Sequence, residues 1–143
     1  MSDLRLSLVT LGVTDVPRAT AFYESVGFRK SSSSVEGDVT FFEGAGTHLG
    51  LWGATNLAED AHLPDDPPQA FRGSSLSMNL PDRATVDAVF AEWVAAGATP
   101  RTEPEETPWG GYTSYVTDPD GHLWEFAHNP GWPLDERGLP ELP

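Results

Sequence analysis

Apolar and polar residues in the first third of the chain predict a strand, a helix and further strands. Residues 6–13 alternate with a period of two, which is typical of a strand with one buried face. Asp15 is a suitable helix N-cap and Gly27 a suitable stop. Between them, apolar residues recur at helical spacing: Ala19, Phe22, Tyr23 and Val26. Three extended stretches separated by glycines follow: 29–35, 39–43 and 48–52.

The same order of elements recurs in the second half of the chain. Residues 74–80 alternate cleanly, and Asp82 and Gly97 bound a second amphipathic helix. Three more strands are expected after it, the first near 99–107. The pattern therefore predicts an α+β protein built of two βαβββ modules, whose helices cover one face of a curved mixed sheet while the other face encloses a cleft.

The modules are expected to form one domain over residues 1–143. The first module spans 4–53 and the second 73–130. An Asp- and Pro-rich linker, 54–72, joins them, and a proline-rich tail, 131–143, follows.

The last two strands form a predicted hairpin that contains an unusual carboxylate. The sequence Asp-Pro-Asp-Gly at 118–121 suits a tight turn, because proline presets φ and glycine accepts a positive φ. It joins the predicted strands 112–117 and 122–127. Glu125 lies in the middle of the otherwise apolar second strand, and burying a carboxylate without a partner is costly. Glu125 is therefore expected to face a cleft or a binding site.

Strand parity sorts the remaining side chains into a core face and a cleft face. The expected core residues are Val9, Leu11, Val13, Leu76, Met78 and Leu80. The expected cleft residues are Leu8, Thr10, Gly50, Trp52, Ser75, Ser77 and Glu125. A mixture of apolar, small polar and acidic side chains is typical of a small-molecule site. The alternative is that Trp52 fills the cleft and that Ser75 or Ser77 satisfies Glu125.

A glycine-rich loop, Trp109-Gly110-Gly111-Tyr112, precedes the hairpin. Its glycines permit a sharp bend, and Trp109 and Tyr112 can close over a planar ligand or instead form a core aromatic pair. Tyr115 has the parity opposite to that of Tyr112, so only one of the two tyrosines should face the cleft.

Composition narrows the classes of function. The chain has 143 residues and a net charge of −14, which opposes binding to nucleic acid or to an anionic membrane surface. It has no cysteine, which excludes disulfides, thiolate ligands and a cysteine nucleophile. No signal peptide or membrane-spanning run is visible, so a cytoplasmic location is expected.

Two stretches carry a family resemblance over nearly the whole chain. One runs from Leu11-Gly12-Val13-Thr14-Asp15 into Ala21-Phe22-Tyr23-Glu24, and the other is Asp118-Pro119-Asp120-Gly121-His122-Leu123-Trp124-Glu125-Phe126. With these, the sequence resembles the vicinal oxygen chelate superfamily, which includes glyoxalase I, bleomycin-resistance proteins and extradiol dioxygenases. The resemblance implies the glyoxalase-like fold and a tendency to form homodimers, but no single activity.

The resemblance also assigns positions to the family's metal ligands, and most of them cannot bind a metal here. The four positions correspond to Leu8, Gly50, Ser75 and Glu125. Catalytic metal sites typically use about three nitrogen, oxygen or sulfur ligands from the protein, and leucine and glycine side chains offer none. His48 shares the strand parity of Gly50 but is more simply a histidine at the rim. We therefore expect no metal and no cofactor.

Three functions remain open. The first is a metal-free protein of the bleomycin-resistance kind that sequesters or carries a small, partly aromatic molecule, neutral or cationic. The expected ligand contacts are Leu8, Thr10, Trp52, Ser75, Ser77, Trp109, Tyr112 and Glu125. The second is a lyase or isomerase that uses Glu125 as a general base. The third, a metal-dependent glyoxalase or dioxygenase, is disfavoured by the missing ligands.

Overall fold

The computed structural model describes residues 4–143. The chain divides into two units, Met1–Pro67 (unit 1) and Pro68–Pro143 (unit 2). The boundary falls inside the segment expected to be the linker, 54–72. Residues 1–3, which contributed to the expectation that no signal peptide is present, lie outside the described part. Within residues 4–143, none of the helices has the length and apolar character needed to cross a membrane.

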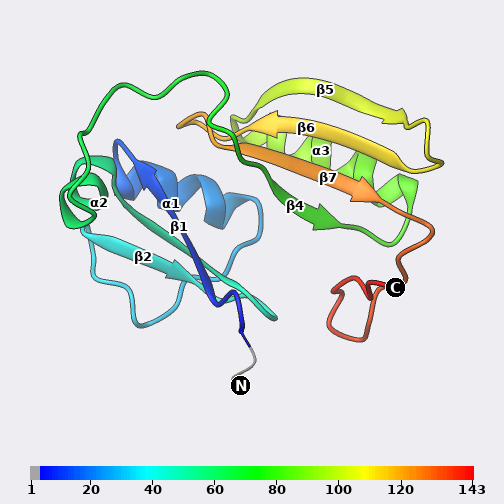
Figure 1. The fold of residues 1–143 in the computed structure, drawn as a ribbon, viewed down its shortest axis with the longest axis horizontal. Helices are drawn as coiled ribbons and strands as arrows, with labels where there is room; N and C mark the ends of the chain where they lie inside the picture. The colour runs from blue at the N-terminus through cyan, green and yellow to red at the C-terminus, as the bar shows by residue number, and fades with distance from the viewer. Residues whose placement is uncertain (1–3) are drawn as a thin grey trace. The chain divides into compact units, whose positions relative to one another are not determined.

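Unit 1 is a three-stranded sheet with a helix on one face (Figure 1). Its elements are β1 (Leu8–Val13), α1 (Val16–Ser25), β2 (Val39–Phe42), β3 (His48–Gly53) and the short α2 (Ala54–Asp60). The strand order is β1-β3-β2, with β1 parallel and β2 antiparallel to β3. As expected, Asp15 caps α1, because its side chain accepts a hydrogen bond from the Arg18 amide at 3.0 Å.

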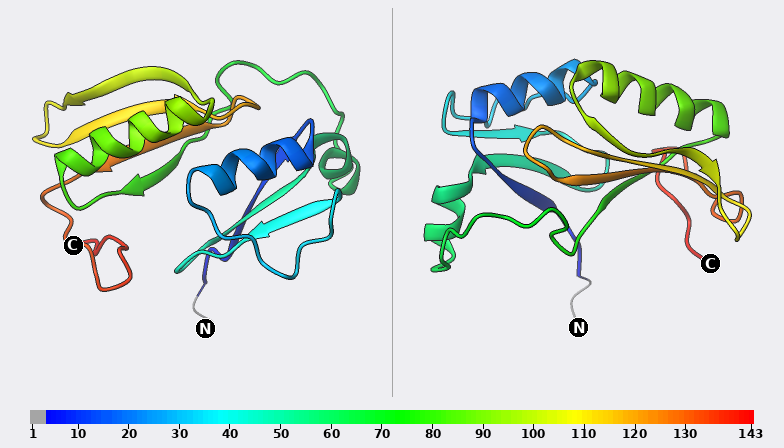
Figure 2. Two further views of the ribbon diagram at one scale, coloured as in Figure 1. Left: turned by 180° about the vertical axis from the view of Figure 1, so that it is seen from behind. Right: turned by 90° about the horizontal axis from the view of Figure 1, so that it is seen from above.

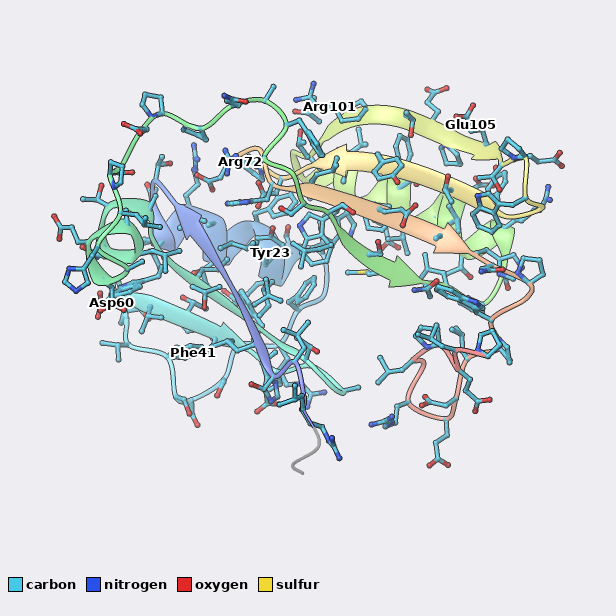
Figure 3. All side chains as sticks on the ribbon, viewed as in Figure 1. Tyr23, Phe41, Asp60, Arg72, Arg101 and Glu105 are labelled. Atoms are coloured by element: carbon cyan, nitrogen blue, oxygen red, sulfur yellow. The ribbon has the colours of Figure 1, made fainter. Side chains whose placement is uncertain are left out.

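Aromatic residues fill the space between α1 and this sheet. Tyr23, labelled in Figure 3, is fully buried and meets the rings of Phe22 and Phe28 edge-on at centroid distances of 5.0 and 5.4 Å. The Thr20 hydroxyl on α1 lies 2.7 Å from the Thr40 hydroxyl on β2, which ties the helix to the sheet. Leu11 and Val13 are buried on this side, as strand parity predicted, and Val9 is half-buried.

The first of the extended stretches predicted after α1 does not form a full strand. Only isolated bridges occur there, Lys30 with Phe42 and Val35 with Val39. The serine run between them turns back on itself, since the Ser34 amide donates to the Ser31 carbonyl at 3.1 Å. The Ser31 hydroxyl also accepts from the Ser33 amide at 3.1 Å, and local side-chain bonds of this kind compete with a strand ladder. Unit 1 is therefore βαββ plus bridges, followed by a helical turn in the linker.

Unit 2 has the βαβββ order that the sequence predicts. Its elements are β4 (Leu76–Asn79), α3 (Arg83–Ala96), β5 (Thr99–Glu106), β6 (Tyr112–Thr117) and β7 (Leu123–His128). The strand order is β4-β7-β6-β5, with α3 on one face (Figure 2). The two mixed sheets and three helices confirm the α+β fold class, and neither sheet closes on itself within residues 4–143.

Helix α3 packs through an indole against β7. The Trp93 ring lies 5.1 Å from the Trp124 ring and 4.9 Å from the Phe126 ring. Trp93, Trp124 and Phe126 are buried, whereas the expected core residues of β4 and just after it, Leu76, Met78 and Leu80, are only half-buried. The edge position of β4 explains this, because one side of an edge strand has no neighbouring strand.

The β6–β7 turn is one residue longer than the sequence suggested. Thr117 pairs with Leu123, so β7 begins at Leu123 and not at His122, and the loop spans 118–122. The buried Asp118 side chain holds this loop by accepting from the amides of Asp120 and His122 at 2.9 and 2.8 Å. This register places Tyr115 directly opposite Glu125.

Candidate functional site

Three polar side chains form a row across adjacent strands of unit 2. Ser77 on β4 and Tyr115 on β6 both pair with Glu125 on β7, which lies between them. Neighbouring Trp124 and Phe126 contact α3, and successive strand residues point to opposite faces of a sheet. The row therefore lies on the face opposite α3, which we call the Glu125 face.

Both carboxylate oxygens of Glu125 are hydrogen-bonded within this row. The Ser77 hydroxyl donates to Oε1 at 2.8 Å, and the Tyr115 hydroxyl donates to Oε2 at 2.9 Å. Glu125 is half-buried. The sequence left open whether Ser75 or Ser77 would bond to Glu125, and the donor is Ser77. Two donors from two neighbouring strands fix the position of the carboxylate.

Tyr115 is held in its neutral, proton-donating form. Burial raises the pKa of Tyr115 above the usual value for tyrosine, and the hydrogen bond to Glu125 and its negative charge raise that pKa further. The phenol therefore remains a donor to Glu125 at and well above neutral pH.

Tyr112 lies against α3, so Tyr115 is the tyrosine of the Glu125 face. The Tyr112 hydroxyl donates to Asp87 on α3 at 2.7 Å, and the Arg83 guanidinium lies over its ring at 5.1 Å from the centroid. The hydrogen bond and the charge of Asp87 contribute to a raised pKa of Tyr112. Tyr112, predicted to be a ligand-binding candidate, is thus directed away from Glu125. The five-residue loop at 118–122 sets the register that places Tyr115 opposite Glu125, whereas the four-residue turn expected from the sequence would have placed residue 114 there.

The other two candidates of unit 2 lie outside the row. Ser75 is exposed immediately before β4, with the same parity as Ser77. Trp109 is 57% exposed and lies over its own turn, because a Cβ at Gly111 would fall 2.1 Å from its ring carbons. A side chain at Gly111 would displace the Trp109 ring, and Gly110 has a positive φ of 91°, so local geometry accounts for both glycines without requiring a ligand.

The candidates of unit 1 share one face of its sheet. A Cβ at Gly50 would lie 3.2 Å from the Thr10 hydroxyl, 3.5 Å from Leu8 Cδ1 and 3.5 Å from Phe41 Cδ1. These side chains therefore converge over Gly50, and Trp52 has the same strand parity. Phe41, labelled in Figure 3, was missed because its face depends on the β2–β3 register, which pairs it with Gly50.

The residues present do not fit the metal site of the superfamily. The side chains of Leu8 and Gly50 have no atom that can bind a metal, and Glu125 is the only carboxylate among the four family positions. Among residues 4–143, no three His, Cys, Asp or Glu side chains are grouped to hold a metal ion. His48 is a further candidate metal ligand from the sequence, because it shares the strand parity of Gly50. Its ring Nδ1 accepts a hydrogen bond from the Gly44 amide at 3.0 Å.

Known proteins resemble the chain in both sequence and structure. The family model of the Glyoxalase/Bleomycin resistance protein/Dioxygenase superfamily matches residues 5–126. A glyoxalase-related enzyme from Fulvimarina pelagi is 31% identical over 96% of this chain and 97% of that one, with a TM-score of 0.84.

Two further solved structures share the fold at lower identity. A glyoxalase/bleomycin resistance protein/dioxygenase family enzyme from Burkholderia phytofirmans PsJN is 22% identical over 87% of this chain and 98% of that one, with a TM-score of 0.75. A lactoylglutathione lyase from Agrobacterium tumefaciens is 21% identical over 94% of this chain and 100% of that one, with a TM-score of 0.70. No curated protein sequence matches the chain significantly.

Proposed function

The chain belongs to the Glyoxalase/Bleomycin resistance protein/Dioxygenase superfamily, and from that membership we propose that it binds a small, partly aromatic molecule on the Glu125 face. The role would be sequestration or resistance, as in the bleomycin-resistance branch of the superfamily. The proposed binding requires no metal, because Glu125 is the only one of the four side chains at the family's ligand positions that suits a metal ion. Cytoplasmic location stays a prediction.

The row Ser77–Glu125–Tyr115 is the observation that supports this proposal. A half-buried carboxylate fixed by two hydroxyls offers an oriented polar anchor, and the half-buried Leu123 flanks it along β7 with the same parity. A few placed polar groups beside apolar surface are typical of small-molecule sites. Leu8, Thr10 and Trp52 of unit 1 stay predicted ligand contacts, as do Ser75, Trp109 and Tyr112.

A thermal-shift screen of aromatic compounds tests the proposal. A ligand that binds the folded chain raises its melting temperature in a concentration-dependent way. Glu125→Gln should reduce the shift caused by a true ligand. Glu92→Gln, which removes the same charge from exposed α3, should leave that shift unchanged. If no compound shifts the wild-type chain, or if both variants respond alike, the proposal fails.

A second candidate function is a metal-free lyase or isomerase with Glu125 as the general base. Two observations favour it: the Fulvimarina pelagi relative is a glyoxalase-related enzyme, and Tyr115 supplies a neutral hydroxyl 2.9 Å from Glu125. An enzyme of this kind should lose about two to four orders of magnitude in rate with Glu125→Gln. A binding protein should lose affinity only.

A further inference from the structure

The Ser77–Glu125–Tyr115 row presents only hydrogen-bond acceptors to a ligand. A hydroxyl has one hydrogen to donate, and here the Ser77 hydrogen goes to Oε1 and the Tyr115 hydrogen to Oε2. An ionised carboxylate has no hydrogen to donate. What remains along the row is lone pairs on three neighbouring side chains, so a ligand that is itself only an acceptor finds no partner there.

The charge of Glu125 also lacks a compensating cation within unit 2. The exposed glutamates Glu36, Glu43 and Glu106 each lie within 4.0 Å of a lysine or arginine nitrogen. Among the described residues, no such ion pair includes Glu125, whose partners are two neutral hydroxyls. A partly buried carboxylate gains most from a cation that also donates hydrogen bonds.

One arginine reaches the same face but is bonded elsewhere. The Arg101 Nε, near the start of β5 in Figure 3, donates to the Thr117 hydroxyl at 3.1 Å. Thr117 pairs with Leu123, two residues along the strand from the Tyr115–Glu125 pair. Arg101 therefore does not use the acceptors of the row in this arrangement, which leaves them for a ligand.

We infer that the row selects ligands that carry a cationic N–H donor, such as an amidinium, guanidinium or protonated amine, over neutral or anionic molecules of the same shape. The inference rests on the proposed function and specifies its ligand class. The half-buried Leu123 beside Glu125 provides apolar surface for an aromatic body attached to the cation, whereas Ala127 on the other side of Glu125 is buried. The net charge of −14 favours the approach of a cation to the molecule as a whole.

Three nearly isosteric compounds separate charge from shape. Benzamidine is a cationic donor, benzamide is neutral, and benzoate is an anionic acceptor. Titrating each into ¹⁵N-labelled protein while recording amide chemical shifts gives an affinity and a location for each. We expect benzamidine to perturb the amides of Ser77, Tyr115 and Glu125 and to bind at least about tenfold more tightly than the other two, since charge-assisted hydrogen bonds are roughly twice as strong as neutral ones.

Variants with matched charge then test the role of Glu125. Glu125→Gln should weaken benzamidine binding by about tenfold or more, because the isosteric amide loses the charge. Glu92→Gln makes the same change in net charge on α3 and should leave the affinity within about twofold. Circular dichroism checks that both variants fold. If Glu125→Gln does not fold, the ranking of the three compounds on the wild-type chain still decides the outcome.

Each contrary result has a distinct meaning. If benzamide or benzoate binds at the same amides as tightly as benzamidine, the ligand class is wrong but small-molecule binding on this face stands. Benzamidine binding that Glu125→Gln leaves intact also overturns the inference. If benzamidine does not bind, the inference falls, and the wider aromatic screen decides the proposed function separately.

Discussion

Buried hydroxyl groups in this protein differ in whether they have a partner. Ser114 on β6 is 0% exposed, and its hydroxyl has no hydrogen-bond partner within residues 4–143. A buried unsatisfied hydroxyl costs about 1–3 kcal/mol, so Ser114→Ala should leave the free energy of unfolding unchanged or raise it by about 1 kcal/mol. Urea unfolding followed by circular dichroism measures the change.

Thr20 is the matched contrast, because its buried hydroxyl is fully used. It donates to the Val16 carbonyl and lies near the Thr40 hydroxyl, both at 2.7 Å. Thr20→Val keeps the shape and leaves Thr40 without this partner, so it should lower the free energy of unfolding by about 1–2 kcal/mol. If Ser114→Ala were the more destabilising of the two, this account of buried hydroxyls would be wrong.

The contact between Tyr115 and Glu125 predicts behaviour at alkaline pH. The pKa of Tyr115 is raised in the folded state, by burial first and then by Glu125. The associated stability is therefore fully present below the unfolded pKa of about 10 and is lost as pH rises through the higher folded pKa. The free energy of unfolding of Tyr115→Phe should consequently depend less on pH above about 10 than that of the wild type.

Tyrosinate absorbance at 295 nm checks the same claim directly. The chain has three tyrosines, so Tyr115→Phe removes a third of the possible signal. We expect the absorbance change that Tyr115→Phe removes to occur, in the wild type, at pH values above the usual titration range of tyrosine. An amplitude that disappears at or below pH of about 10 would show that Glu125 does not hold the phenol in its neutral form.

The face of the sheet on which a side chain lies could be predicted from the sequence more readily than the residues that it contacts. The expectation that Glu125 lies on the face opposite the helix required only strand parity and agrees with the structure. The choice between Tyr112 and Tyr115 required the register, which depends on whether the Asp118 loop has four residues or five. The clustering of Leu8, Thr10 and Phe41 over Gly50 depends on pairings across three strands that no local pattern encodes.

Among the elements, α3 depends on its N-cap. The Asp82 side chain accepts from the Thr85 hydroxyl at 2.6 Å and from the Thr85 amide at 2.7 Å, and these two bonds lower the pKa of Asp82. The stability associated with a lowered pKa is present above the unfolded value of about 3.9 and is lost as pH falls through the folded pKa. Asp82→Ala should thus be less stable than the wild type at pH 7, with a difference that narrows in acid.

Asp82→Ser is the control for this prediction. A serine hydroxyl still caps the helix but carries no charge, so it should restore much of the stability without the acid dependence. Unfolding in urea at pH 7 and at about pH 3 gives the comparison. Equal loss for alanine and serine, or a difference that widens in acid, would contradict the capping account.

Helices and hairpins were the elements best predicted from the sequence, because caps and turn residues act locally. The stretch 29–35 failed as a strand because serine hydroxyls accept from the Ser33 and Phe41 amides, a competition that β-periodicity does not reveal. Strand β5, by contrast, forms although its sequence contains residues that disfavour a strand. It contains Pro100 and Pro104 and two register shifts, yet it pairs with β6 as the edge of its sheet. Prolines and bulges protect such an edge from pairing with another chain.

At the scale of the whole molecule, the repeated pattern corresponds to two units, each with its own sheet and its own helix packed on it. The homodimer implied by the family resemblance stays a prediction. Light scattering during gel filtration should then give a mass of about twice the 15.5 kDa of the chain. A mass near that of one chain at micromolar concentration would contradict it.

The most direct test of the central claim is a crystal structure with the tightest-binding compound from the thermal-shift screen. The account predicts ligand density on the face of unit 2 opposite α3, with a donor atom at hydrogen-bonding distance from a Glu125 carboxylate oxygen. Density only on the α3 side of the sheet, or a ligand bound elsewhere while Glu125 contacts only Ser77 and Tyr115, would contradict it.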